Sequence, residues 1–154
     1  MNDKERFMRV ALEQAKKASK ADEVPVGAVI VRGGEIIAKA YNKKNASKNA
    51  LRHAEMDVLN KAQKVLGDWH LMDCELYVTL EPCPMCAGAC INARIGAIYF
   101  GASDMKAGCC GSLYNLPSDN RFNHRPKVMG GILEEECGRL LSDFFKAKRR
   151  KGDI

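Results

Sequence analysis

The stretch TLEPCPMCAGAC, residues 79–90, decides the fold of this chain. It begins at the end of a β-rich run, ELYVTL (75–80), and continues from Pro84 as small residues typical of a short helix that starts with proline. Cys83 and Cys86 are three positions apart, which places both sulfur atoms on one face of the first helical turn. Unpaired amides and the helix dipole at that end favour thiolates, the form that binds a metal ion. We therefore predict a strand that leads directly into a helix carrying a thiolate pair.

Further elements are predicted on both sides of this unit, and they alternate between helix and strand. Amphipathic helices, a hairpin and short apolar strands are separated by turns rich in glycine and proline. The alternation predicts an α/β fold in which helices cover a mixed sheet. The expected elements are a helix over 3–19, strands 24–31 and 35–41, a helix over 56–65 that Gly67 ends, strand 75–80, helix 84–93, strand 95–102, an irregular segment 103–126, strand 127–129 and a helix over 133–145.

Length and composition limit the class of protein. The 154 residues favour a single domain, 1–154, and a hydrophobic fraction of 46% excludes a disordered chain. The longest apolar runs, such as 25–31, are far too short to span a bilayer, and the charged start MNDKERF does not resemble a signal peptide. We therefore expect a cytoplasmic protein without a membrane partner. Seven cysteines in a reducing compartment favour metal binding or core packing over disulfides.

The thiolate pair needs further ligands to hold a metal. A structural zinc site has four protein ligands, but the chain has no second Cys-x-x-Cys, and the adjacent Cys109 and Cys110 have poor geometry for sharing one ion. Of the three histidines, His53 lies where a predicted helix begins. A site built from His53, Cys83 and Cys86 leaves one coordination position open, which a catalytic zinc requires.

Glu55 follows His53 at a spacing that constrains the backbone. Residues i and i+2 point roughly 200° apart in a regular helix, so the two side chains converge only if His53 lies at the irregular start of the helix. The polar loop 42–50 before it permits that conformation. Zinc held by two thiolates and an imidazole lowers the pKa of a bound water toward ~7, and a carboxylate beside that water can carry protons to a substrate. Glu55 is therefore the candidate catalytic carboxylate.

The two motifs HAE (53–55) and PCPMC (82–86) together form the known signature of zinc-dependent nucleobase deaminases. Along nearly its whole length the chain resembles the bacterial tRNA-specific adenosine deaminases. Three stretches after residue 100 discriminate this branch: GCCGSLYNL (108–116), NHRPKV (123–128) and GILEEECGRLLSDFF (131–145). The resemblance implies a cytidine-deaminase-like fold, which is a three-layer α/β/α sandwich with a mixed five-stranded sheet, and it implies a homodimer.

The resemblance also implies an activity and roles for particular residues. The expected reaction is hydrolysis of adenosine to inosine, with release of ammonia, at the wobble position of a tRNA anticodon stem-loop. Such a loop is already single-stranded, so extruding the base costs less than it would in a duplex. The expected residues are His53, Cys83 and Cys86 for one zinc ion per subunit, Glu55 for proton transfer, Asn42 for reading the base, and Asp104, Lys106, Phe145 and Arg149 for RNA contacts.

The C-terminal segment 146–154 contains five bases and one acid. On charge alone it is either a solvated helix end or a contact for the phosphate backbone, and the resemblance favours the contact. Leu51, Arg52 and Pro84 depart from the family pattern, although none of them is an expected metal ligand or proton carrier. They bear on the choice of substrate.

Two alternatives remain open. A deaminase of a free base or nucleoside, of guanine or cytosine type, would need neither the basic tail nor the segments SDMK (103–106) and NHRPK (123–127). A zinc-stabilised RNA-binding subunit without chemistry would be expected to lack the carboxylate of Glu55, which is present. An inosine assay on transcribed tRNA separates all three functions.

Overall fold

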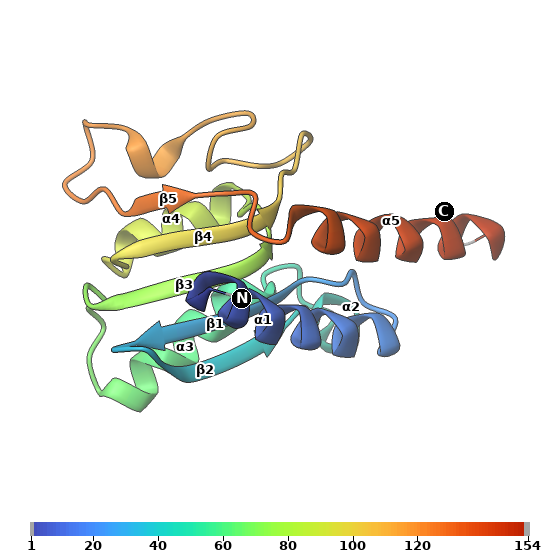
Figure 1. Cartoon of the computed structure of the whole chain (residues 1–154), viewed down its shortest axis with the longest axis horizontal. Helices are drawn as coiled ribbons and strands as arrows, with labels where there is room; N and C mark the ends of the chain where they lie inside the picture. The colour runs from blue at the N-terminus through green and yellow to red at the C-terminus, as the bar shows by residue number, and fades with distance from the viewer. Residues whose placement is uncertain (1, 153–154) are drawn as a thin grey trace.

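A mixed five-stranded sheet forms the middle layer of the computed structural model, which describes residues 2–152 (Figure 1). The strands are β1 (Gly27–Arg32), β2 (Glu35–Tyr41), β3 (Cys74–Leu80), β4 (Ala97–Ala102) and β5 (Lys127–Met129). They lie in the order β2-β1-β3-β4-β5. β1 pairs antiparallel with β2 and β3, whereas β4 pairs parallel with β3 and β5. The expected mixed sheet is confirmed.

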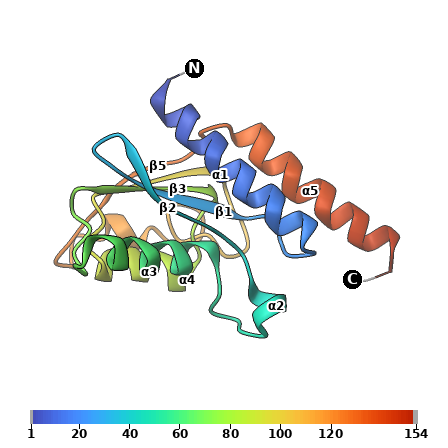
Figure 2. The ribbon, with the colours of Figure 1, turned by 90° about the horizontal axis from the view of Figure 1, so that it is seen from below.

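Helices cover both faces of this sheet and complete a three-layer α/β/α sandwich (Figure 2). The helices are α1 (Asp3–Lys20), α2 (Lys44–Ser47), α3 (Ala54–Leu66), α4 (Pro84–Asn92) and α5 (Glu134–Arg150), with one 3₁₀ turn, η1 (Leu116–Ser118). α1 and α5 lie on one face, and α3 and α4 lie on the other. Two clusters of buried apolar side chains fill the two interfaces. Each helix of the described residues is too short or too polar to be a membrane span.

The central strands β1 and β3 are buried on both faces, which explains their continuous apolar sequences. Gly27 allows α1 to pack directly on β1, because a Cβ atom there would lie 2.1 Å from the carbonyl oxygen of Ala11. On the same face the rings of Tyr77 and Tyr99 stack with their centroids 4.9 Å apart. This packing fixes the sheet from which α3 and α4 are positioned on the opposite face.

Two predicted strands begin later than expected. The strand expected from residue 24 starts at Gly27, because the carbonyl oxygen of Val24 accepts hydrogen bonds from the N–H of Val26 and from the side chain of Asn42, and not from a neighbouring strand. The strand expected from residue 95 starts at Ala97. The segment 103–126 is irregular as predicted, apart from η1 and an isolated bridge.

α5 projects past the ends of the strands and includes most of the basic tail (Figure 1). The helix ends at Arg150, and its Lys148 forms an ion pair of 2.6 Å with Asp22, in the turn after α1. Lys148 also lies over the ring of Phe144. The helix predicted over 133–145 therefore continues into the basic tail as far as Arg150, and residues 153–154 lie outside the described residues.

Candidate metal centre and pocket

Two helix N-termini on one face of the sheet supply the candidate metal ligands. α3 begins after His53, whose backbone is extended with φ −77° and ψ 151°, and α4 begins after Cys83, which is also extended. Cys86 follows in the first turn of α4 and is buried. The prediction that His53 precedes the regular helix is confirmed, and this conformation lets its imidazole ring face the cysteines.

The three donor atoms are close enough to share one ion. His53 Nδ1 lies 3.6 Å from the Sγ atoms of both Cys83 and Cys86, and all three atoms lie within 4.8 Å of one another. Tetrahedral zinc with its usual bond lengths would hold a sulfur and a nitrogen about 3.6 Å apart. Among residues 2–152 this is the single group of three or more His, Cys, Asp or Glu side chains with such spacing. The donor set therefore fits a zinc site with an open fourth position.

The surroundings favour a thiolate at Cys83. The pKa of Cys83 is lowered to about 4, first by a hydrogen bond from the Cys86 thiol and further by His53. The pKa of Cys86 is raised in turn, because its thiol donates that bond and is buried. A hydrogen bond with Cys83 also raises the pKa of His53, against the effect of burial. Negative charge therefore gathers on sulfur where a cation would bind.

Glu55 lies in the first turn of α3 and lines the same pocket as His53 and Cys83. Only 4% of its surface is exposed. Burial raises the pKa of Glu55 to about 7, the neighbouring Cys83 adds to the rise, and His53 opposes it. A carboxyl group with a pKa in this range can both accept and donate a proton at neutral pH.

A pocket of about 180 Å³ opens over these groups. The segment after β2 contributes Asn42 and Lys44, and the segment after β4 contributes Asp104 and Ala107. The apolar part of the lining comes from Val24, Val26 and Leu80. A larger groove between α1 and α5 contains none of the candidate metal ligands. The pocket therefore combines a fixed chemical centre with walls made largely of irregular segments.

Asn42, expected to read the base, has a defined place in this pocket. Its Oδ1 accepts a hydrogen bond of 2.9 Å from the N–H of Ala54, the first residue of α3. Its Nδ2 donates to the carbonyl oxygen of Val24 at 3.2 Å. The amide group thus connects the start of α3 with the segment before β1, and one N–H of Nδ2 remains for a ligand.

The other expected RNA contacts are divided between the pocket, the segment after β4 and α5. Asp104 is in the pocket wall, where its Oδ1 accepts hydrogen bonds from the backbone N–H groups of Lys106 and Ala107. The Lys106 side chain is exposed. Phe145 and Arg149 lie on α5 and are not part of the pocket lining. The structure therefore brings Asp104 to the centre and leaves Phe145 and Arg149 on the projecting helix.

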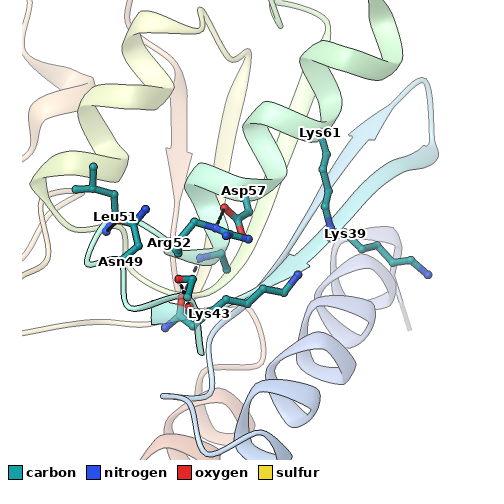
Figure 3. Close-up of polar contacts among 10 residues, drawn as sticks. Lys39, Lys43, Asn49, Leu51, Arg52, Asp57 and Lys61 are labelled. Carbon is teal, nitrogen blue, oxygen red and sulfur yellow. Dashed lines mark hydrogen bonds and ion pairs between the residues drawn. The ribbon is translucent and has the colours of Figure 1, made fainter. Parts of the chain in front are cut away.

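Arg52, which was expected to bear on the choice of substrate, forms an ion pair with Asp57 at the start of α3 (Figure 3). Its Nε and Nη2 donate to the two carboxylate oxygens of Asp57 at 2.8 and 3.0 Å. The backbone N–H of Asp57 donates to the carbonyl oxygen of His53. This pair therefore braces the first turn of the helix that carries Glu55.

Glu81 is a pocket residue that the sequence did not identify. Its carboxylate is 2% exposed and accepts hydrogen bonds from Asp104, Cys110 and Ser112. Burial would raise its pKa, but these hydrogen bonds outweigh burial and lower it. A charged residue between a buried strand and the Pro-Cys turn was the available signal, because a buried charge needs fixed partners.

Comparisons with known proteins agree with this geometry. A family model described as MafB19-like deaminase matches residues 2–149. The tRNA-specific adenosine deaminase of Bacillus subtilis (strain 168) is 51% identical over 151 residues, covering 98% of this chain and 94% of that protein. This chain belongs to the tRNA-specific adenosine deaminase family. A solved tRNA:A34 deaminase, from work on A-to-I editing at the wobble position of transfer RNA, superposes with a TM-score of 0.85 at 41% identity and covers 88% of this chain and 99% of that one.

A purine-base deaminase also matches, but over less of the molecule. The guanine deaminase of Bacillus subtilis is 43% identical, yet the match covers 67% of this chain and 66% of that one, with a TM-score of 0.62. The resemblance to tRNA-specific adenosine deaminases extends over nearly the whole chain. Identity and coverage are high together in the match to the tRNA-specific adenosine deaminase, but not in the match to this guanine deaminase.

Proposed function

We propose that this protein hydrolyses adenosine to inosine at the wobble position of a tRNA anticodon and releases ammonia. The observation that carries the proposal is the convergence of Glu55, His53 and Cys83 in one pocket, with the buried Cys86 completing the group of metal ligands. The match to tRNA-specific adenosine deaminases along almost the entire chain supports tRNA as the substrate.

His53, Cys83 and Cys86 would hold one zinc ion per subunit. The ion would supply Lewis-acid activation of a water molecule, the nucleophile for C6 of adenine. Glu55 takes one proton of this water and delivers it to N1 of the base. It then takes the remaining proton from the new hydroxyl group on C6 and delivers it to the departing amino group. Adenosine and water become inosine and ammonia, so the reaction needs no further reagent. Because Glu55 is buried beside the cluster, its proton transfers occur away from bulk water.

The remaining pocket residues orient the base. Asn42 is fixed by its bonds to Ala54 and Val24, so its remaining N–H can donate to a ring nitrogen without reorganisation. Val24, Val26 and Leu80 offer apolar surface to the base. We assign the reading of adenine to Asn42 because its amide is the pre-oriented polar group of this lining.

Basic side chains from the end of β2 and from α3 support an RNA partner (Figure 3). We call Lys39, Lys43 and Lys61 the basic cluster, and the neighbouring Arg52 is paired with Asp57. Lys61 Nζ donates to the carbonyl oxygen of Lys39 at 2.8 Å. Burial lowers the pKa of Lys61, and the positive charges of Lys43 and Arg52 add to this effect, which places these charges near one another. Clustered positive charge attracts a phosphate backbone. Asp104, Lys106, Phe145 and Arg149 are proposed as further RNA contacts.

We also propose that residues 1–154 act as one deaminase domain, as a homodimer and in the cytoplasm. One sheet carries both site-bearing helices, which supports a single domain. The cysteines are all unpaired thiols, in keeping with a reducing compartment. The homodimer rests on the family resemblance.

The experiment is an inosine assay on a pool of transcribed tRNAs with purified, zinc-loaded protein. The expected result is inosine only at the wobble position and only in tRNAs that carry adenosine there. A tRNA in which the wobble adenosine is replaced by guanosine is the matched control. Ammonia released from free guanine, cytosine or adenosine, without inosine in tRNA, would instead establish the free-base or nucleoside alternative. Tight tRNA binding with no product would establish the non-catalytic alternative.

A further inference from the structure

Four hydrogen-bond donors from one loop converge on the carboxylate of Glu81. Its Oε1 accepts from the backbone N–H of Asp104 at 3.0 Å and from the hydroxyl group of Ser112. Its Oε2 accepts from the backbone N–H groups of Cys110 and Ser112, both at 3.0 Å. An ionised carboxylate only accepts hydrogen bonds, so it suits four donors. All four donors belong to the loop 104–112, so both ends of this loop are bonded to the same carboxylate.

Glu81 is itself held firmly at the end of β3. Its backbone N–H donates to the carbonyl oxygen of Ala102, and the next residue, Pro82, accepts a hydrogen bond from the N–H of Cys109. Gly108 packs against the carboxylate, since a Cβ atom there would lie 2.3 Å from the Glu81 carboxyl carbon. The loop therefore closes around this side chain without spare volume.

The Glu81 carboxylate links the turn that carries the candidate ligand Cys83 to the loop 104–112, which forms part of the pocket wall. Cys83, two residues after Glu81, is a candidate metal ligand, while the loop 104–112 presents Asp104 and Ala107 to the same pocket. The positions of Asp104 and Ala107 relative to the metal centre therefore depend on the Glu81 carboxylate.

We propose that Glu81 is a positioning residue that fixes the loop 104–112 against the turn preceding Cys83 and thereby sets the shape of the pocket over the bound base. This inference rests on the proposed function, because it concerns binding of the substrate in that pocket. Glu81 lies outside the proton-transfer chemistry assigned to Glu55. Substitution of Glu81 should therefore raise KM more than it lowers kcat.

Glu81→Gln is the decisive substitution because it keeps size and shape. If the new NH₂ group occupies the Oε2 position, it faces the N–H groups of Cys110 and Ser112. If it occupies the Oε1 position, it faces the N–H of Asp104. In either orientation at least one backbone N–H meets a donor and loses its acceptor.

The test compares wild type and Glu81→Gln by zinc content, steady-state kinetics on tRNA and amide hydrogen exchange. We expect unchanged zinc, a KM raised roughly tenfold with kcat lowered less than about threefold. We also expect amide exchange at 104, 110 and 112 to be at least about tenfold faster. A merely structural role would lower the active fraction, and hence kcat, with KM unchanged. That result, or unchanged exchange in the loop, overturns the proposal.

Glu23→Gln is the matched control for removing a buried carboxylate. Glu23 is also 2% exposed and accepts hydrogen bonds from the backbone N–H groups of Asn45 and Ala46, at 2.9 and 2.8 Å. Its substitution should speed exchange at 45 and 46 and leave 104–112 unchanged. Faster exchange in both loops with either variant would indicate general destabilisation and would overturn the specific role of Glu81.

Ser112→Ala keeps the proposal testable if Glu81→Gln does not fold. It removes one donor and leaves the three backbone N–H bonds to Glu81. The expected KM increase is smaller, about twofold to fivefold, with kcat nearly unchanged; an unchanged KM overturns the proposal. Wild-type protein that forms no inosine would refute the proposed function, whereas hydrogen exchange would still decide whether Glu81 holds the loop.

Discussion

The metal centre and the rim of the pocket are built in different ways. His53 and Cys83 cap the regular helices α3 and α4, which pack on a buried sheet. The rim consists of the segments 42–52 and 103–112, which have little regular structure. We call these segments the rim loops. The chemistry is therefore placed on rigid elements, while surfaces that select the substrate are placed on loops.

In each rim loop, backbone N–H groups donate hydrogen bonds to a buried carboxylate. Glu23 accepts hydrogen bonds from the backbone of Asn45 and Ala46, and Glu81 accepts them from the loop 104–112. Both carboxylates are 2% exposed. Loops fixed in this way can change sequence and shape without disturbing the metal ligands, so substitutions in the two regions should have separable effects.

Loss of a metal ligand should have the largest effect. Wild-type protein should contain about one zinc per chain, because three donors with the spacing of a zinc site are present. Cys83→Ala and Cys86→Ala should each lose bound zinc and all detectable inosine formation, measured by metal analysis and the tRNA assay. Cys137→Ala, which removes a buried thiol on α5, is the matched control and should keep its zinc. Zinc retained in both ligand variants would refute the assignment.

Glu55→Ala should have the next largest effect and should separate chemistry from metal binding. The carboxylate moves protons and does not ligate the ion, so the variant should keep its zinc and its fold. General acid–base catalysis is worth roughly 10²–10⁴-fold, so single-turnover inosine formation should fall by about that factor. Activity close to wild type would remove Glu55 from the mechanism.

The exposed end of α5 should contribute a moderate, salt-dependent part of tRNA binding. Lys148 is engaged with Asp22 and is best left in place, whereas the exposed Arg149 and Arg150 form no ion pair within the described residues. Arg149→Ala/Arg150→Ala should weaken binding several-fold. The slope of log affinity against log salt should become shallower by about one unit for each phosphate group that the variant no longer neutralises.

Arg6→Ala/Lys64→Ala is the matched control for that tail variant, because it also removes two exposed positive charges. Arg6 lies near the start of α1 and Lys64 lies in the last turn of α3, away from the helix N-termini that form the centre. Binding and salt slope should match wild type in this control. Equal loss of tRNA affinity in both variants would show that the tail contributes only through the net charge of the protein.

Arg52→Ala should have the smallest effect and should act on stability. It leaves Asp57, which is 8% exposed, without its guanidinium partner at the start of α3. Because Arg52 is partly exposed, Tm should fall by only roughly 2–4 °C, and by less in high salt. The check is thermal unfolding at low and high salt, with Arg32→Ala, which breaks the surface pair with Asp73, as control. Loss of zinc in Arg52→Ala would instead show that the Arg52–Asp57 pair supports the metal centre.

The sequence by itself determined the elements of the fold, the zinc ligands expected and the candidate proton carrier. Cys83 and Cys86 share a helical turn, and the His53–Glu55 spacing required an extended residue before α3, which the structure contains. These features depend on the geometry of a few consecutive residues, and this geometry is the same in every helix.

Only the tertiary structure decided how the rim loops are held. The structure contains hydrogen bonds between Glu81 and residues 104–112 and between Asn42 and Ala54, and an ion pair between Lys148 and Asp22. The two partners of each contact are 12 or more positions apart in the sequence. No periodic pattern encodes such pairs, because an irregular loop has no fixed rise or rotation per residue. Which buried carboxylate meets which amide is settled only when the sheet, its helices and both loops close together.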